Sequence, residues 1–231
     1  LVRNLGIAAG GTVMEDCRVL EACREGKYTS VLVQTHDKKY VEYRTEHFVN
    51  ALGSGAGKLC DSMGIDAGLY PVRHQAFITR RLPMLGKHGT NLDMLIDRQD
   101  YKGFSAVYGQ QIAYTGQIIG CASPKLDAMR IDKNLKVNTK AFLEIVSEMF
   151  SEWIPDLAGV GIQAVWAGYY TEPRYIVDPE LGLFVGMRGH GFMLSQYIAR
   201  MYVDKLLGRP VPEYFEKLKL NGPGLSEKAF K

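Results

Sequence analysis

The feature that most constrains the fold is a glycine-rich turn between a short apolar run and a long helical pattern. Leu183–Met187 is the apolar run, Arg188–Phe192 (RGHGF) is the turn, and apolar residues then recur at helical spacing as far as Gly208. The first amides of a helix lack internal acceptors and carry partial positive charge, and glycines let a ligand approach the backbone. The pattern is therefore suited to an anionic or polarised ligand group, and a tight turn without a ligand fits it equally well.

Strand patterns mixed with amphipathic helices predict an α+β fold, in which a mixed-sheet body is joined to a piece of α/β sheet. The expected strands are 19–22, 31–33, 40–43, 48–51, 70–79, 104–108, 112–114, 117–121, 160–166 and 183–187. Gly26 marks a hairpin, while Gly109 and Gly116 are read as breaks in a meander. The clearest helix covers 139–153, and the residues after Pro212 are expected to be peripheral.

Composition excludes several classes of protein. The 46% hydrophobic and 23% charged residues are typical of a globular chain, and no stretch approaches the roughly 20 apolar residues of a membrane-spanning helix. The 28 basic and 25 acidic residues form no basic tract, which argues against a nucleic-acid partner. Four scattered cysteines and five scattered histidines predict no metal site. With no leader sequence, we expect a reduced, cytoplasmic protein.

The familiar catalytic and phosphate-binding motifs are absent or incomplete. A dinucleotide fingerprint needs a third glycine three residues after the second and an acidic residue about 20 residues later, and Gly53–Gly57 (GSGAG) does not meet this spacing. We therefore expect at most a backbone contact with a cofactor there. The sequence has no Gly-x-Ser-x-Gly and no His-Glu-x-x-His. The tyrosines are numerous enough to line an aromatic pocket, although each also suits a half-buried strand position. They are Tyr108, Tyr114, Tyr169, Tyr170 and Tyr175.

Four segments, taken in order, resemble the FAD-dependent amino-acid and amine oxidoreductases related to D-amino-acid oxidase, sarcosine oxidase and glycine oxidase. They are Phe48–Gly57 (FVNALGSGAG), Tyr70–Gln75 (YPVRHQ), Trp166–Tyr170 (WAGYY) and Gly182–Phe192 (GLFVGMRGHGF). The last segment is the most specific. The ordered set extends the resemblance from about Gly10 to Gly208.

The resemblance implies FAD as the cofactor. Backbone amides of the turn would lie near the pyrimidine edge of the flavin, where the helix N-terminus stabilises negative charge on the reduced ring. Val19 would meet the adenine, and Ala51 and Gly53 would lie along the nucleotide. The implied turn residues are Gly186, Arg188, Gly189, His190, Gly191 and Phe192.

The resemblance also divides the chain into functional parts. Residues 1–68 would belong to an FAD-binding domain, residues 69–165 to a substrate-binding domain with a mixed sheet and the helix 139–153, and residues 166–231 to the FAD-binding domain again, with the flavin turn at 186–192.

The substrate implied is a small amino acid or secondary amine, such as proline, sarcosine or a D-amino acid, oxidised at its C–N bond by hydride transfer to flavin N5. Tyr108, Tyr169 and Tyr170 would line its pocket. Many members have an arginine where Tyr170 stands, so Arg73 or Arg174 is the candidate partner of a substrate carboxylate. No catalytic base is identified, and an amine that binds deprotonated needs none.

The family's opening strand, Gly-x-Gly-x-x-Gly turn and helix have no counterpart before Gly53, and the sequence starts at Leu1. We therefore expect a C-terminal fragment, inactive alone, whose pyrophosphate-binding element lies in a missing N-terminal segment or another subunit. The alternative is a non-catalytic scaffold or ligand-binding subunit without flavin, against which the three glycines of the turn argue. The sequence leaves open whether the electron acceptor is oxygen, a quinone or a carrier protein. It also leaves open whether the protein forms a homo-oligomer and whether it associates with a membrane through a partner.

Overall fold

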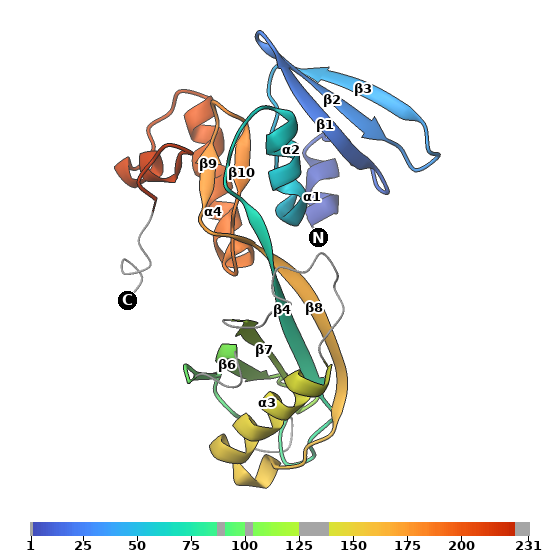
Figure 1. The fold of residues 1–231 in the computed structure, drawn as a ribbon, viewed down its shortest axis with the longest axis vertical. Coiled ribbons are helices and arrows are strands. Elements are labelled where there is room, and N and C mark those ends of the chain that lie inside the picture. Colours follow the sequence, from blue (N-terminus) through green and yellow to red (C-terminus); the bar gives the residue numbers. More distant parts are fainter. Residues whose placement is uncertain (1, 87–90, 100–103, 125–138, 225–231) are drawn as a thin grey trace. The chain divides into compact units, whose positions relative to one another are not determined.

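A computed structural model describes residues 2–86, 91–99, 104–124 and 139–224 (Figure 1). The chain forms two compact units. Unit 1 contains Leu1–Leu69 and Pro173–Lys231, and unit 2 contains Tyr70–Glu172. Helices and separate antiparallel sheets confirm the predicted α+β class. No helix among the described residues is long and apolar enough to cross a membrane.

Unit 1 combines a three-stranded sheet, a two-stranded sheet and three α-helices. The three-stranded sheet has the antiparallel order β1-β2-β3, and β9 pairs with β10. The predicted hairpin is confirmed, since Gly26 joins β1 to β2 with a φ of 64°. The elements are α1 (Val2–Ala8), β1 (Arg18–Glu25), β2 (Tyr28–Gln34), β3 (Tyr40–Thr45), α2 (Ala56–Ser62), β9 (Ile176–Asp178), β10 (Leu183–Val185), α4 (Gly191–Leu206) and the 3₁₀ helix η3 (Glu213–Leu218).

The strand predicted over 48–51 is wrong. Only Asn50 pairs, through a single parallel bridge to Leu183 of β10. Its buried side chain donates from Nδ2 to the carbonyl of Ala56 at 3.0 Å and accepts at Oδ1 from the amide of Leu52 at 3.2 Å. These bonds turn the chain toward α2, so the strand cannot continue.

The residues after Pro212 are not peripheral, contrary to prediction. Phe215 and Leu218 of η3 are fully buried in a cluster with Ile198 and Met201 of α4. The carboxylate of Asp178 in β9 also accepts a hydrogen bond from the amide of Leu220 at 3.3 Å. Two buried apolar side chains and one polar contact therefore fix this segment to unit 1.

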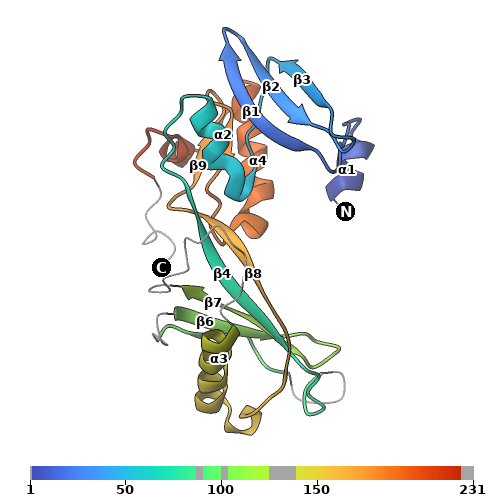
Figure 2. The same cartoon turned by 45° about the vertical axis from the view of Figure 1, so that its right-hand side comes forward.

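Unit 2 is an antiparallel sheet in the order β5-β6-β7-β4-β8 with the helix α3 packed on one face (Figures 1 and 2). The predicted helix over 139–153 is confirmed at both ends. The elements are β4 (Tyr70–Thr79), β5 (Leu95–Asp97), β6 (Phe104–Gln111), β7 (Ile118–Pro124), α3 (Thr139–Trp153), the 3₁₀ helix η2 (Pro155–Leu157) and β8 (Ile162–Glu172).

Two details of unit 2 differ from the prediction. The expected strand over 112–114 is a turn, in which the amide of Ile112 donates to the carbonyl of Gln117 and the amide of Gly116 donates to the carbonyl of Ile112, while β6 continues through Gly109. β8 stays paired with β4 as far as Glu172, opposite Tyr70. The compact unit 2 therefore includes all of β8 and ends at Glu172, whereas the substrate-binding domain expected from the sequence ends at residue 165.

The two faces of the sheet differ in what covers them. Phe77 of β4 packs under α3 with Phe142, Ile145 and Phe150, all buried, and its ring lies 5.7 Å from that of Phe150. Successive side chains of a strand point to opposite faces, so His74 and Ala76 point away from α3. The face that carries them is the start of the candidate site.

Candidate functional site

A pocket of about 400 Å³ lies on the face of the unit 2 sheet that α3 does not cover. Aromatic and neutral polar side chains from four strands line it, among them His74, Tyr108, Gln110, Cys121, Trp166 and Tyr170. The described lining residues include no Arg, Lys, Asp or Glu. The pocket therefore offers aromatic surface and neutral hydrogen-bonding groups in place of fixed charges.

Strand register brings these side chains together. Tyr108 of β6 lies opposite Cys121 of β7, Cys121 lies opposite Ala76 of β4, and Ala76 lies opposite Trp166 of β8. Directly opposed residues of an antiparallel pair point to the same face, with Cβ atoms about 5 Å apart. The imidazole of His74 also stacks on the ring of Tyr170, with centroids 3.8 Å apart and an interplanar angle of 29°.

Tyr108, Tyr170 and Cys121 are partly or fully buried groups that line this pocket. Tyr108 of β6 lies directly opposite Cys121 of β7, whose thiol donates to the carbonyl of Ala122 at 3.8 Å. Burial raises the pKa of the Tyr108 and Tyr170 hydroxyls, and it raises the pKa of the Cys121 thiol to about 11. All three groups are therefore protonated and neutral near pH 7.

The structure separates Arg73 from this pocket. Arg73 is fully buried and lies between His74 and Val72 on β4, so it points to the opposite face. Tyr169 lies opposite Arg73 on β8, although it also borders the pocket. Of the predicted substrate residues in unit 2, the register thus brings Tyr108 and Tyr170 together on one face.

Arg174 belongs to unit 1, and its side chain is hydrogen-bonded to the main chain of the segment that follows η3. Its Nη1 donates to the carbonyl of Gly222 at 2.9 Å, and its Nη2 donates to the carbonyl of Leu220. The guanidinium therefore satisfies two backbone acceptors of the segment after η3.

The turn before α4 is built from unusual backbone conformations. Gly186 has a φ of 70° and Arg188 a φ of 49°. A Cβ at Gly186 would collide with the backbone oxygen of Arg174, so only glycine fits there. A Cβ at Gly191, the first residue of α4, would lie 3.0 Å from Cβ of Met187.

The turn presents its backbone at the N-terminus of a 16-residue helix. Gly189 and His190 are exposed, and the ring of Phe192 is 97% exposed. Nδ1 of His190 is hydrogen-bonded to the hydroxyl of Tyr175, and the amide of His190 donates to the carbonyl of Met187 at 3.1 Å. The partial positive charge of a helix N-terminus suits an electron-rich ligand edge, so the arrangement fits the flavin group that the resemblance implies.

Ala51 and Gly53 lie at the same edge of unit 1 as this turn. Because Asn50 and Leu183 pair in parallel, the chain after Asn50 and the chain after β10 leave the pair in the same direction. Both residues are exposed, and Gly53 has a φ of 55° with no atom within 4 Å of the position of a Cβ.

Val19 lies elsewhere in unit 1. It is half-buried in β1 and packs beside the cluster of Ala22, Val31 and Leu59. Its backbone is part of the β1–β2 ladder, opposite Val33.

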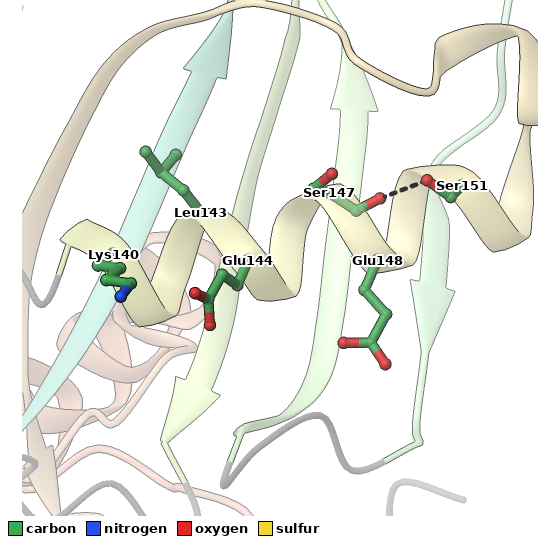
Figure 3. Close-up of a pocket in the computed structure, with 6 residues that line it drawn as sticks. All are labelled: Lys140, Leu143, Glu144, Ser147, Glu148 and Ser151. Carbon is green, nitrogen blue, oxygen red and sulfur yellow. Dashed lines mark hydrogen bonds between the residues drawn. The ribbon is translucent and has the colours of Figure 1, made fainter.

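A second hollow lies on the outer side of α3 (Figure 3). Its six lining residues all lie between Lys140 and Ser151, so one helix forms it alone. Glu144 and Glu148 project on one side, and Oγ of Ser151 donates to the carbonyl of Ser147 at 2.9 Å. No cluster of three potential metal ligands occurs within the described ranges. We assign no ligand to this surface.

The sequence analysis did not select His74, Gln110, Cys121 or Trp166 as pocket residues. The alternation of β4 offered a signal for His74, which stands between buried Arg73 and Gln75. Cys121 could not be recognised, since its role depends on which residues of β4 and β6 lie opposite it.

Comparison with known proteins agrees with these features. The profile of the family described as FAD dependent oxidoreductase matches residues 1–205. The structure is similar to L-proline dehydrogenase from P. horikoshii, with 25% identity and a TM-score of 0.72 over 93% of this chain and 55% of that one. No curated protein matches the sequence.

Two further solved structures share the fold. Glycine oxidase from Geobacillus kaustophilus has 18% identity and a TM-score of 0.68 over 93% of this chain and 54% of that one. Iminodiacetate oxidase from Chelativorans sp. BNC1 has 15% identity and a TM-score of 0.67 over 96% and 57%. The chain thus spans little more than half the length of the solved relatives that it matches.

Proposed function

The chain belongs to the FAD dependent oxidoreductase family, and from this premise we propose that it acts in the oxidation of the C–N bond of a small amino acid or secondary amine. The observation that carries the proposal is the uncharged aromatic pocket on the open face of the unit 2 sheet. FAD, when bound, supplies the acceptor for the hydride that leaves the α-carbon of the amine.

We assign the cofactor to the edge of unit 1 that follows the Asn50–Leu183 bridge. The backbone of Gly186, Arg188, Gly189, His190, Gly191 and Phe192 would hold the flavin, Ala51 and Gly53 the nucleotide, and Val19 the adenine. In support, a side chain at Gly186 would collide with the backbone, and Gly189, His190 and Phe192 at the start of α4 are exposed residues. Partial positive charge at a helix N-terminus stabilises a group that gains negative charge on reduction.

The pocket would bind the amine in its neutral form. Moving an ammonium ion into a partly buried site without a counter-charge is costly, and the described lining residues hold no carboxylate. The amine would therefore lose its proton before it binds, so that a dedicated base is not required. Trp166 and the stacked His74–Tyr170 pair supply surface for its apolar body.

We propose that neutral donors orient the polar end of the substrate in place of an arginine. Arg174 donates to two backbone carbonyls, and Arg73 points to the other face of the sheet. The hydroxyl of Tyr108 and the imidazole of His74 belong to residues that line the pocket, with Tyr169 at its border.

We further propose that a dinucleotide-binding segment, on the same polypeptide or on a partner subunit, binds the pyrophosphate of FAD. In support, the sequence has no Gly-x-Gly-x-x-Gly. The described residues alone are then expected to be inactive.

The test is a substrate panel on the protein as its cell makes it, together with any subunit that copurifies. Flavin absorbance is measured first, and then reduction of an artificial dye with proline, sarcosine and D-amino acids. We expect bound flavin and dye reduction with at least one of them. Flavin without turnover of any amine would reject the substrate class, and absence of flavin would favour the non-catalytic scaffold.

A further inference from the structure

Gly168 lies within β8, on the face of the unit 2 sheet that carries the pocket. It pairs with His74 of β4, and Trp166 and Tyr170 precede and follow it by two residues. Alternate residues of a strand share a face, so both aromatic side chains lie on the face where a side chain of Gly168 would project, with their α-carbons about 13 Å apart. All three residues line the pocket. We call this gap between two aromatic residues, with Gly168 as its floor, the aromatic slot.

The fold itself does not require a glycine at this position. Glycine weakens the interior of a strand, and it is expected at a positive φ, at a bulge or where another part of the chain comes close. The φ of Gly168 is not positive, and the irregular pairing of β4 with β8 lies away from it, at Ile78 and Thr79. No atom of the described residues lies within 4 Å of the position of a Cβ at Gly168. A side chain could therefore stand there without a collision.

Two other strand glycines of this sheet differ in this respect. A Cβ at Gly120 of β7 would collide with the carbonyl oxygen of Tyr108 and with the ring of Phe77. A Cβ at Gly109 of β6 would lie 3.1 Å from Cγ2 of Ile118. Close neighbours thus account for Gly109 and Gly120, whereas the lack of a side chain at Gly168 only leaves open space in the pocket.

The pocket has room for more than an amino group. Its volume of about 400 Å³ is more than twice the roughly 150 Å³ of an engineered core cavity that binds benzene. Trp166 borders the slot on one side, and Tyr170, stacked on His74, borders it on the other. Aromatic surfaces of this kind bury apolar area and pack against rings.

We propose that Gly168 determines which substrates fit, because its missing side chain opens the aromatic slot to an apolar group, about the size of a ring, carried by the amine. The inference rests on the proposed function and deepens it: it narrows the substrate class to amines with such a group and names the residue that selects them. Gly168 acts through the space that it leaves and takes no part in the transfer of hydride.

The first test fills the slot. Gly168→Ala and Gly168→Val are compared with wild type on amines of increasing size, either sarcosine, proline and N-methylphenylalanine or D-alanine, D-leucine and D-phenylalanine. We expect wild type to prefer the larger amines. The ratio of kcat/KM between the largest and the smallest amine oxidised should fall at least about tenfold in Gly168→Val, and less in Gly168→Ala. An unchanged ratio, or a wild type that prefers the smallest amine, would overturn the inference.

The second test measures stability and needs no turnover. Valine favours strands, and no described atom blocks its Cβ, so the urea midpoint of Gly168→Val should be higher than that of wild type. A lower midpoint would show that the fold requires this glycine, and would reject a role confined to the substrate.

Ala164→Val is the matched control. Ala164 is exposed on the same strand, opposite Ile78, and is not among the described lining residues of the pocket. The substitution should raise the midpoint and leave the preference for large amines unchanged. The same loss of preference in Ala164→Val would show that stiffening of β8, and not the slot, selects the substrate. If wild type oxidises no amine, the proposed function fails together with the role of Gly168. If wild type is active and Gly168→Val affects all amines alike, only the present inference fails.

Discussion

The turn before α4 and the pocket on the unit 2 sheet are built in opposite ways. The turn depends on its backbone conformation, with Gly186 at a φ of 70° where no Cβ fits. The pocket depends on its side chains, and strand register sets which of them meet. The turn is therefore sensitive to a methyl group added at Gly186, whereas the pocket is sensitive to changes in the side chains that line it.

This contrast explains what each region can specify. A main-chain surface can bind a cofactor shared by many proteins, since it depends on backbone amides and not on particular side chains. A pocket lined by Tyr108, Cys121 and His74 can change its substrate by single substitutions without altering the sheet. Specificity within the family is thus expected to reside in unit 2.

The largest expected effect comes from adding a methyl group to the turn. Gly186→Ala should lower the free energy of unfolding by about 3 kcal/mol, because positive φ and a collision with the carbonyl of Arg174 act together. Denaturant unfolding measures the loss, and flavin absorbance of the purified protein should fall with it.

The matched control lies at the other end of α4. Gly208 has a φ of 68° with nothing within 4 Å of a Cβ, so Gly208→Ala should cost only about 1 kcal/mol. Equal losses for the two glycines would show that the collision at Gly186 is relieved by local adjustment.

The next effect is a dependence of stability on pH that originates in the pocket. Burial raises the pKa of Cys121 from 9.0 to about 11, so the unfolded chain ionises this thiol first. Its contribution is complete below pH 9 and is lost between pH 9 and 11, by about 2.5 kcal/mol. Unfolding curves of wild type should fall more steeply over this range than those of Cys121→Ser, and parallel curves would contradict the assignment.

A smaller loss of unfolding free energy is expected at Arg174, whose side chain donates hydrogen bonds to two main-chain carbonyls. Arg174→Met removes the donors to Gly222 and Leu220 and should cost about 2 kcal/mol in unfolding free energy. Limited proteolysis should then cut after η3 sooner than in wild type. The KM for amino-acid substrates should not change, and a rise in KM of tenfold or more would restore Arg174 as the carboxylate partner.

The smallest effect is expected from the stacked pair in the pocket. His74→Ala removes the ring contact with Tyr170 and should cost about 1 kcal/mol, while His74→Phe keeps a stacked ring and should be nearly neutral in stability. If imidazole orients the substrate, both variants raise KM. A normal KM in His74→Phe would limit His74 to support of Tyr170.

Local patterns were sufficient to predict much of the fold. The apolar spacing of 139–153 predicted α3 at its observed ends, and Gly26 predicted the hairpin between β1 and β2. Short patterns failed, because Ile112–Tyr114 is apolar enough for a strand yet forms a turn closed by Gln117. Phe215 and Leu218 gave too short a pattern to reveal a buried 3₁₀ helix.

Only part of the candidate site could be predicted from the sequence. The turn could be found because its glycines are local in the chain. Tyr108, Tyr169 and Tyr170 were predicted as pocket residues, but His74 and Trp166 were not, because they meet through the pairing of β4 with β8, which are far apart in sequence. The hydrogen bonds of Arg174 could not be predicted either, since its two acceptor carbonyls lie 46 and 48 residues later in the sequence.

The pairing of Tyr70 with Glu172 has a consequence for the order in which the molecule assembles. Unit 2 is one continuous stretch, whereas unit 1 is made from two segments on either side of it. Before unit 2 folds, joining the halves of unit 1 must close a loop as long as unit 2, with the entropy cost of a long loop. Once β4 and β8 have paired, Tyr70 lies opposite Glu172, so Leu69 and Pro173 start from neighbouring positions. The entropy cost of closing the long loop then no longer applies. We therefore expect the sheet of unit 2 to form before the two halves of unit 1 join.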